Sequence, residues 1–262
     1  RFLLVALCLG LLTLTACSDS SDKVEDISQE VDTSEDEDPT RTAAVTTVRT
    51  RAATPVPTPA DVKEVILEAS GFTYLPSQYS TSTTYGFILK NQALRHSATD
   101  VSVQIAFYDA AGAVVSTESQ AVAFMFPGER IGIGGSSYTD SGQPVEMRIQ
   151  IRATDFTEWD ATRSTATLAF SNISMTPQQY GGFKTTGEVT SPFTKDVESV
   201  RLDAVFKDGN GAIIGGEFTY QDFIPAGAVA AFEITSLSST GISPASAEVF
   251  GQLGYLTLSS LD

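Results

Sequence analysis

Cysteine and histidine are nearly absent from this chain. The only cysteines, Cys8 and Cys17, lie close to its start, and His96 is the only histidine among 262 residues. Disulfide bridges, thiolate zinc sites and cysteine nucleophiles are therefore excluded beyond residue 17. A Ser-His-Asp triad and most zinc and copper sites need histidine, so hydrolase and metalloenzyme chemistry are disfavoured. We predict no catalytic, cofactor-binding or metal-binding residues, no cofactor and no enzymatic activity.

Positive charge is scarce as well. The chain carries 16 Lys and Arg against 32 Asp and Glu, a formal charge of −16. Ten acidic groups fall within residues 18–38 beside one Lys, while residues 61–262 hold 22 acidic and 11 basic groups. No basic stripe is present to drive counterion release, so we expect no nucleic-acid partner. Anionic lipid surfaces would repel the chain unless a covalent anchor holds it there.

Long apolar segments are also missing. A bilayer-spanning helix takes about 20 residues, whereas the apolar run Phe2 to Leu14 has 13. That run fits the apolar core of a secretory signal, with Arg1 as the remnant of the basic region before it. Leu14-Thr15-Ala16-Cys17 follows and resembles the lipobox of bacterial lipoproteins. In that family the signal is cut before the Cys, which is then acylated.

The lipobox resemblance implies a signal peptide over residues 1–16 and a lipid, palmitate included, on Cys17. It also implies attachment to a membrane of a bacterial cell envelope, facing the extracytoplasmic side. Several acyl chains would hold firmly, at about 0.8 kcal/mol per buried CH₂. The alternatives are a plain signal peptide with an incidental Cys and a buried apolar helix.

Residues 17–60 are predicted to form a disordered tether behind the lipidated Cys. Residues 18–38 are rich in Ser, Asp and Glu, and residues 40–59 in Thr, Ala and Pro. Such segments cannot offset the entropy cost of ordering, and alternating prolines keep the end extended. A Ca²⁺-binding or partner-binding acidic tail is the alternative, although the spacing of an EF-hand loop is absent.

One pattern occurs twice in the rest of the chain. Residues from Val101 to Phe107 alternate between apolar and small or polar, and Asp109 to Gly112 form a turn sequence. The alternation returns from Val200 to Phe206, before the turn sequence Asp208 to Gly211. A period of two predicts a strand with one buried face, and Asp followed by Gly favours a tight turn.

Further matches keep the same order at offsets of about 98 to 101. They are Pro76-Ser-Gln-Tyr79 with Pro177-Gln-Gln-Tyr180, Gly86 with Gly187, and Pro127-Gly128 with Pro225-Ala226-Gly227. Ordered matches indicate a duplication. We therefore predict a first domain over residues 61–154, a linker over 155–165, and a second, diverged domain over 166–262.

Each copy holds about seven strand-like runs, and no window shows a sustained helical period. Regularly spaced short strands predict an all-β fold of two tandem immunoglobulin-like β-sandwiches. The expected runs of the first copy lie near 64–74, 84–91, 100–108, 112–118, 120–126, 129–135 and 145–152. Those of the second lie near 166–175, 183–190, 197–207, 212–219, 220–224, 228–235 and 247–258.

Ile105-Ala-Phe-Tyr-Asp109, with Gly112 and Pro127-Gly128-Glu129, resembles the FxLYD family of bacterial extracytoplasmic domains. The resemblance covers about 62–154 and, more weakly, 166–258. It implies an immunoglobulin-like sandwich and supplies no catalytic residues. This chain departs from the family pattern at Ile105, Phe107, Ala204, Phe206 and Lys207.

Two local features offer sites, each beside a simpler interpretation. His96 with Asp100 and a serine would make a nucleophile system, but no Gly-x-Ser-x-Gly elbow is present, so a solvated loop histidine is favoured. Asp208 to Gly211 with Asp203 would make a Ca²⁺ loop, but Asp-Gly and Asn-Gly are typical of hairpin turns.

Trp159 and the tyrosines offer two more candidates. Asp155, Glu158 and Asp160 around Trp159 would suit sugar chemistry, although acidic linkers are commoner and the tryptophan is expected to pack between the domains or cap one of them. Four tyrosines would form a binding face or the rim of a core. They are Tyr74, Tyr79, Tyr85 and Tyr180.

These observations predict a non-enzymatic, membrane-anchored protein that serves as a protein-interaction or spacer module, with an envelope protein or a glycan as partner. The alternative is a carbohydrate or small-ligand binder that uses strand-end loops or the inter-domain groove around Trp159. A hydrolase with carboxylate chemistry is the third hypothesis, with Asp155, Glu158 and Asp160 as its candidates.

Overall fold

The computed structural model describes residues 61–76, 81–139, 142–153, 155–179, 181–236 and 242–254. These residues form thirteen strands and no helix, and they lie in one compact unit, Pro57–Asp262. The all-β prediction is confirmed for this part of the chain. The predicted signal peptide, Cys17 and the tether lie outside the described residues.

The first half of the unit contains seven strands. They are β1 (Val65–Leu75), β2 (Ser82–Asn91), β3 (His96–Tyr108), β4 (Val114–Met125), β5 (Arg130–Tyr138), β6 (Glu146–Arg152) and β7 (Asp155–Glu158). The second half contains β8 (Ala169–Pro177), β9 (Phe183–Thr190), β10 (Val197–Lys207), β11 (Ile213–Ile224), β12 (Val229–Thr235) and β13 (Ser246–Gln252).

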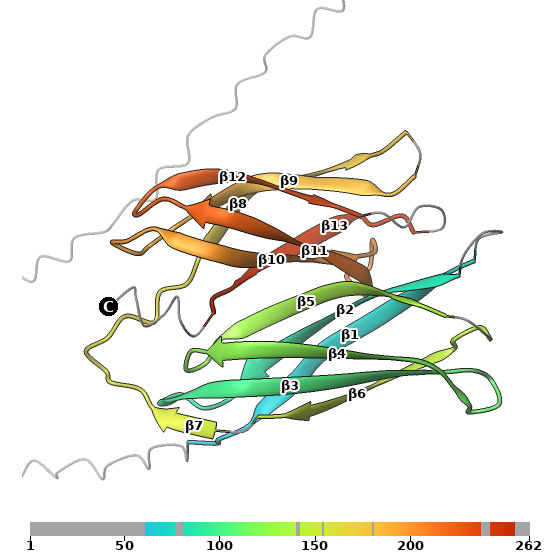
Figure 1. Cartoon of the computed structure of the whole chain (residues 1–262), viewed down its shortest axis with the longest axis horizontal. Coiled ribbons are helices and arrows are strands. Elements are labelled where there is room, and N and C mark those ends of the chain that lie inside the picture. The colour runs from blue at the N-terminus through green and yellow to red at the C-terminus, as the bar shows by residue number, and fades with distance from the viewer. Residues whose placement is uncertain are drawn as a thin grey trace, which may run out of the picture. The chain divides into compact units, whose positions relative to one another are not determined.

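The strands form four antiparallel sheets (Figure 1). Sheet A has the order β1-β2-β5, and sheet B has β4-β3-β6 with β7 also paired to β3. Sheet C has the order β12-β9-β8, and sheet D has β11-β10-β13. Strands β1 to β6 therefore correspond in order to β8 to β13, and the two halves share one strand order.

The prediction of seven runs in each copy was wrong at one place. Runs 112–118 and 120–126 form the single strand β4, and runs 212–219 and 220–224 form β11. Neither junction contains the Gly or Pro that would interrupt a ladder. The additional strand, β7, lies in the stretch predicted as the linker.

Each half has a core between its two sheets. On β3, Val101, Val103, Ile105 and Phe107 are buried, and they pack against side chains of sheet A such as Phe87. The second half repeats this on β10. Its buried side chains there are Val200, Leu202, Ala204 and Phe206. The prediction of one buried face is thus confirmed for β3, whereas on β10 the other face is buried too, at Asp203 and Val205.

The two predicted turns are built alike. The Asp109 carboxylate accepts hydrogen bonds from the backbone N–H groups of Ala111, at 2.9 Å, and Ala113, at 2.8 Å. The Asp208 carboxylate accepts the equivalent bonds from Asn210 and Ala212, both at 2.9 Å. These backbone bonds lower the pKa of Asp208. The carboxylates thus hold their own turns, as the hairpin interpretation predicted.

Sheets A and D pack against each other through glycines. A Cβ atom at Gly71 would lie 1.8 Å from the carbonyl oxygen of Ile213, and one at Gly86 would lie 2.4 Å from that of Gly215. Only glycine permits this backbone approach. A small buried cluster completes the contact, formed by Ile88, Val205, Ile213 and Phe250.

Candidate functional site

A buried ion pair lies where sheet D meets sheet A. Asp203, on β10, has no exposed surface, and the Arg201 side chain is 14% exposed. Arg201 Nη2 lies 2.9 Å from Asp203 Oδ1. The pair also reaches the backbone of β5: Gly134 N–H donates to Asp203 Oδ1 at 3.0 Å, and Arg201 Nη2 donates to the Gly134 carbonyl at 3.2 Å.

This ion pair caps a sheet edge. Strand β5 pairs with β2 alone in sheet A, and the Asn91 N–H bonds the Glu129 carbonyl at 2.9 Å. Alternation along an antiparallel ladder then directs the N–H and C=O of Gly134 away from β2. Asp203 supplies the acceptor and Arg201 the donor that a neighbouring strand would otherwise supply.

Neutral side chains complete this network. Gln120 accepts from Arg201 Nη1 at 2.9 Å and donates to the Tyr85 hydroxyl at 2.7 Å. Gln252 donates to Asp203 Oδ2 at 2.8 Å. Burial raises the pKa of Asp203, against the opposing effect of Arg201, and burial raises the pKa of Tyr85 to about 12. The groups satisfy one another, so the network positions the two halves.

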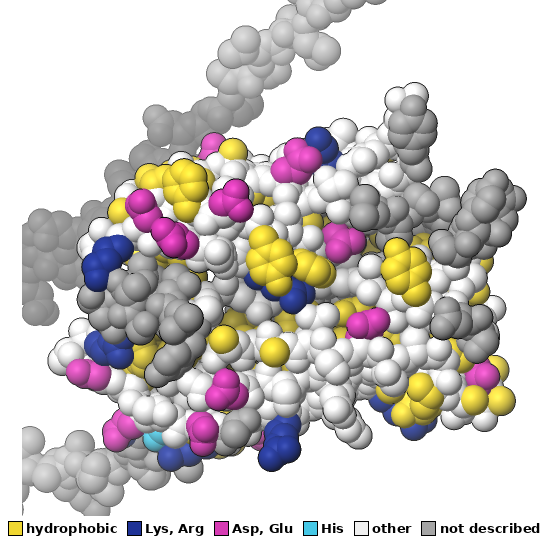
Figure 2. All heavy atoms as spheres, viewed as in Figure 1, with side chains coloured by type: hydrophobic (Ala, Val, Ile, Leu, Met, Phe, Trp, Pro, Cys, Tyr) yellow, Lys and Arg dark blue, Asp and Glu magenta, His cyan; other side chains and the backbone are white. Residues whose placement is uncertain are grey.

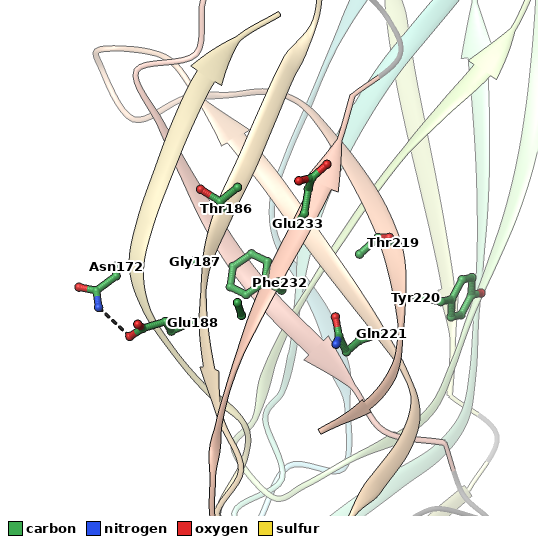
Figure 3. Close-up of a pocket in the computed structure, with 10 residues that line it drawn as sticks. Asn172, Thr186, Gly187, Glu188, Thr219, Tyr220, Gln221, Phe232 and Glu233 are labelled. Atoms are coloured by element: carbon green, nitrogen blue, oxygen red, sulfur yellow. Dashed lines mark hydrogen bonds between the residues drawn. The ribbon is translucent and has the colours of Figure 1, made fainter. Parts of the chain in front are cut away.

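A groove of about 650 Å³ lies along β12 and β11 in the second half. Figure 3 shows Phe232 between the Asn172–Glu188 pair and the side chains of Thr219 and Gln221. Asn172 Nδ2 donates to Glu188 Oε2 at 2.7 Å. We call this the β11–β12 groove. It contains no residue that the sequence singled out as a candidate.

Glu233 adds a second carboxylate to the β11–β12 groove. Lys184 Nζ lies 3.0 Å from Glu233 Oε2, and this hydrogen bond lowers the pKa of Glu233. Both carboxylates are held by hydrogen bonds. The exposed Ala231 lies on the same face of sheet C as these carboxylates, whereas the Phe232 ring, 4% exposed, points into the core. The groove therefore carries negative charge beside a small apolar side chain, which suits a positively charged, partly apolar group.

A larger pocket, of about 860 Å³, lies at Trp159. The Trp159 ring centroid is 5.6 Å from that of Phe124 and 5.2 Å from that of Phe126. The Arg163 guanidinium lies 4.5 Å from the centre of the Trp159 ring, in a cation–π geometry. The tryptophan thus packs against the fold, which confirms its packing interpretation, and it still borders a pocket.

The three carboxylates near Trp159 do not converge. Asp155 and Glu158 are both exposed and lie three residues apart on β7, so their side chains point to opposite faces. The Asp160 carboxylate accepts from the Thr162 N–H at 2.9 Å and hydroxyl at 2.8 Å, which lowers its pKa. Only Glu158 and Asp160 border the pocket.

His96 differs from its prediction as a solvated loop residue. It begins β3, and its Nδ1 lies 2.5 Å from Asp61 Oδ2. The other Asp61 oxygen accepts from the Leu94 N–H at 2.6 Å. The carboxylate partner is therefore Asp61 rather than Asp100. Local sequence could not reveal it, because 35 residues separate Asp61 from His96.

The remaining candidates divide between described and undescribed residues. Tyr85 is buried and Tyr74 is half-buried, so these two do not present an exposed face. Tyr79, Tyr180 and the lipidation candidate Cys17 lie outside the described residues. Nowhere in the described ranges do three His, Cys, Asp or Glu side chains gather as metal ligands would.

Comparisons with known proteins add no family. No family model matches the chain, and no curated protein matches it. The resemblances to lipoproteins and to FxLYD domains therefore stay predictions. Within the described ranges, no helix has the length and hydropathy that a membrane crossing requires.

Proposed function

We propose that this protein is a non-enzymatic lipoprotein of a bacterial cell envelope that acts as a protein-interaction or spacer module. Its two halves would be immunoglobulin-like sandwiches related to FxLYD domains, held off the membrane by residues 17–60 and a lipid on Cys17. The observation that carries the proposal is the close packing of sheets A and D, because a spacer must hold its ends at a fixed separation.

Stiffness has a physical basis in that contact. Where backbones meet at glycines, no flexible side chain lies between them to absorb sliding. The Arg201–Asp203 pair adds directional bonds to one point of β5. A partner bound by one half would then stand at a set distance from the other half.

Spin labels would measure this stiffness. Residues 61–262 contain no cysteine, so Thr117→Cys and Thr186→Cys would place single labels on sheets B and C. We expect one narrow distance distribution by double electron–electron resonance. A broad distribution, or one with two maxima, would reject the rigid spacer.

Anchoring and partners need tests in cells. Palmitate labelling should disappear in the Cys17→Ala variant, and globomycin should block maturation of the unsubstituted chain. Continued labelling of the variant would reject the lipobox. Crosslinking in intact envelopes should capture a protein partner, and its repeated absence would count against an interaction role.

The second candidate function is carbohydrate or small-ligand binding at Trp159. The pocket there supports it, because Trp159 borders a space that Arg95, Glu158 and Asp160 also line. Trp159 is the only tryptophan in the chain, so its fluorescence reports on this place alone. Saturable quenching by a glycan would favour binding, and no change across a glycan panel would count against it.

A further inference from the structure

Strand β12 is an edge of sheet C. It pairs with β9 alone in that sheet. The Ser191 N–H bonds the Ala228 carbonyl at 3.0 Å, and the Ser236 N–H bonds the Phe183 carbonyl at 2.8 Å. Alternation between these two bonds directs the N–H and C=O groups of Ala231 and Glu233 away from β9. Within the part of the chain that the structure describes, the free edge of β12 therefore presents backbone groups that pair with no strand, on the groove side.

The same edge in the first half is covered. Glu233 on β12 corresponds to Gly134 on β5, 99 residues earlier, and Thr219 on β11 corresponds to Gln120 on β4. In the first half, Arg201 bonds both the Gly134 carbonyl and Gln120. In the second half the corresponding place is the β11–β12 groove, and the described residues that line it include no arginine and no aspartate.

We propose that the β11–β12 groove binds an extended segment of a partner protein, which adds as a strand to β12 and places an arginine beside Glu188 and Glu233. This inference rests on the proposed role as an interaction module and names its surface. Backbone bonds to Ala231 and Glu233 would hold the segment, as in other strand additions. The partner's arginine would cover the edge of β12 as Arg201 covers the edge of β5.

Charge and shape favour this occupant. The rim carboxylates of Glu188 and Glu233 suit a guanidinium, which forms bidentate bonds to carboxylates. Ala231, which is exposed and lies opposite Glu188 in the ladder, offers the apolar stem of an arginine a surface on the same face of β12.

A second copy of this chain does not offer the same cap. Sheet B is the counterpart of sheet D in the first half, so a second copy would present the outer face of its sheet B to the groove. There Ser102 and Gln104 stand at the positions of Arg201 and Asp203. Neither side chain carries a charge, so a second copy stacked in the manner of sheet D would bring no ion pair from β3 to the groove; the arginines of that face, Arg148 and Arg152, lie on β6 instead.

The test uses the full-length chain and fluorescein-labelled peptides of nine residues. The peptides alternate Thr and Val, and carry Arg, Gln or Glu at the centre. We expect saturable anisotropy changes with the Arg peptide, and binding about tenfold weaker with Gln because a charge-assisted bond is lost. The Glu peptide should not bind. Equal binding of all three, or none by the Arg peptide at millimolar concentration, overturns the proposal.

Backbone methylation separates strand addition from side-chain capture. N-methyl groups on alternate residues facing β12 should abolish binding, whereas methyl groups on the other residues should leave it unchanged. Ala231→Pro removes one edge N–H and keeps the ladder to β9, so it should weaken binding about tenfold at an unchanged melting temperature. Insensitivity to both changes overturns strand addition.

Charge variants test the place of the arginine. The double variant Glu188→Gln with Glu233→Gln should bind the Arg peptide about tenfold more weakly and should bind the Gln peptide as tightly as the unsubstituted chain does. Glu146→Gln on sheet B is the matched control and should change neither. If the chain instead forms dimers that Ala231→Pro abolishes, a second copy occupies the groove and the proposal is wrong. Envelope crosslinks that map elsewhere, with no peptide binding, would reject this surface while leaving the interaction module intact.

Discussion

The outward faces of sheets A and D differ in kind from those of sheets B and C. Where A meets D, the outward positions hold glycines such as Gly86, apolar groups such as Phe250, and polar groups that are paired across the contact, such as Asp203. The outward positions of B and C hold exposed polar groups, such as Gln104 on β3 and Glu233 on β12. All four sheets carry an apolar face in a sandwich core, so only the outward residues decide which sheets meet.

This difference explains why sheets B and C are the outermost layers of the stack. A further sheet would have to desolvate charged and amide groups on B or C without the partners that Arg201 and Asp203 find. Charged groups of both signs are spread over the visible face of the molecule (Figure 2). Polar outer faces of this kind act as the caps of repeat proteins do.

The largest effect should come from breaking the buried pair. Arg201→Met leaves Asp203 buried without its counter-charge, which should lower the free energy of unfolding by about 3–5 kcal/mol. Urea denaturation measures it. Arg148→Met, on the exposed face of sheet B, is the control and should change little. A loss for Arg201→Met below about 1 kcal/mol would mean that the pair does not join the halves.

Filling a glycine contact should cost less. Gly86→Val brings a side chain against the Gly215 carbonyl, so sheets A and D must move apart, at a cost of about 1–3 kcal/mol. The control is Gly209→Ala, where an added Cβ meets nothing within 4 Å. Equal stability of the two variants by urea denaturation would contradict close packing at this position.

The first half should have a pH dependence of stability that the second half lacks. Burial raises the pKa of Glu129 to about 8, and Ala228 occupies the corresponding turn of the second half. Between pH 4.5 and 8 the unfolded chain has released this proton and the folded chain retains it. Stability from this group is therefore lost as pH rises through that window. Glu129→Gln should remove a fall of about 3 kcal/mol between pH 5 and 8, measured by denaturation at both values; an unchanged slope would contradict the shift.

The smallest effect should come from a substitution on the outer face of sheet B. Gln150 corresponds to Phe250, which packs between A and D, yet Gln150 faces outward and is exposed. Gln150→Ala should change the free energy of unfolding by no more than about 0.5 kcal/mol. A larger loss by urea denaturation would indicate that this face is covered.

Local pattern predicted much of the fold. The alternation around Val103 and Leu202 indicated the two cores, and Asp109 and Asp208 indicated their turns, because both features depend on neighbours in sequence. The junction inside β4 was missed because adjacent runs without Gly or Pro need not be separate strands.

Contacts between residues far apart in the chain could not be predicted from local sequence pattern. Gly86 and Gly187 match at an offset of 101, yet Gly86 faces the Gly215 backbone and Gly187 faces the Phe232 ring in a core. A shift of one residue in register exchanges the faces of a strand. Likewise, nothing near Arg201 in sequence indicates that it bonds Gly134, which is 67 residues away.

The central claim is that sheets A and D join two sandwiches into one folding unit. Differential scanning calorimetry of the full-length chain tests it most directly, by comparing the calorimetric enthalpy with the van't Hoff enthalpy. We predict a single transition with equal enthalpies, which becomes two transitions in Arg201→Met. Two resolved transitions in the unsubstituted chain would contradict the account.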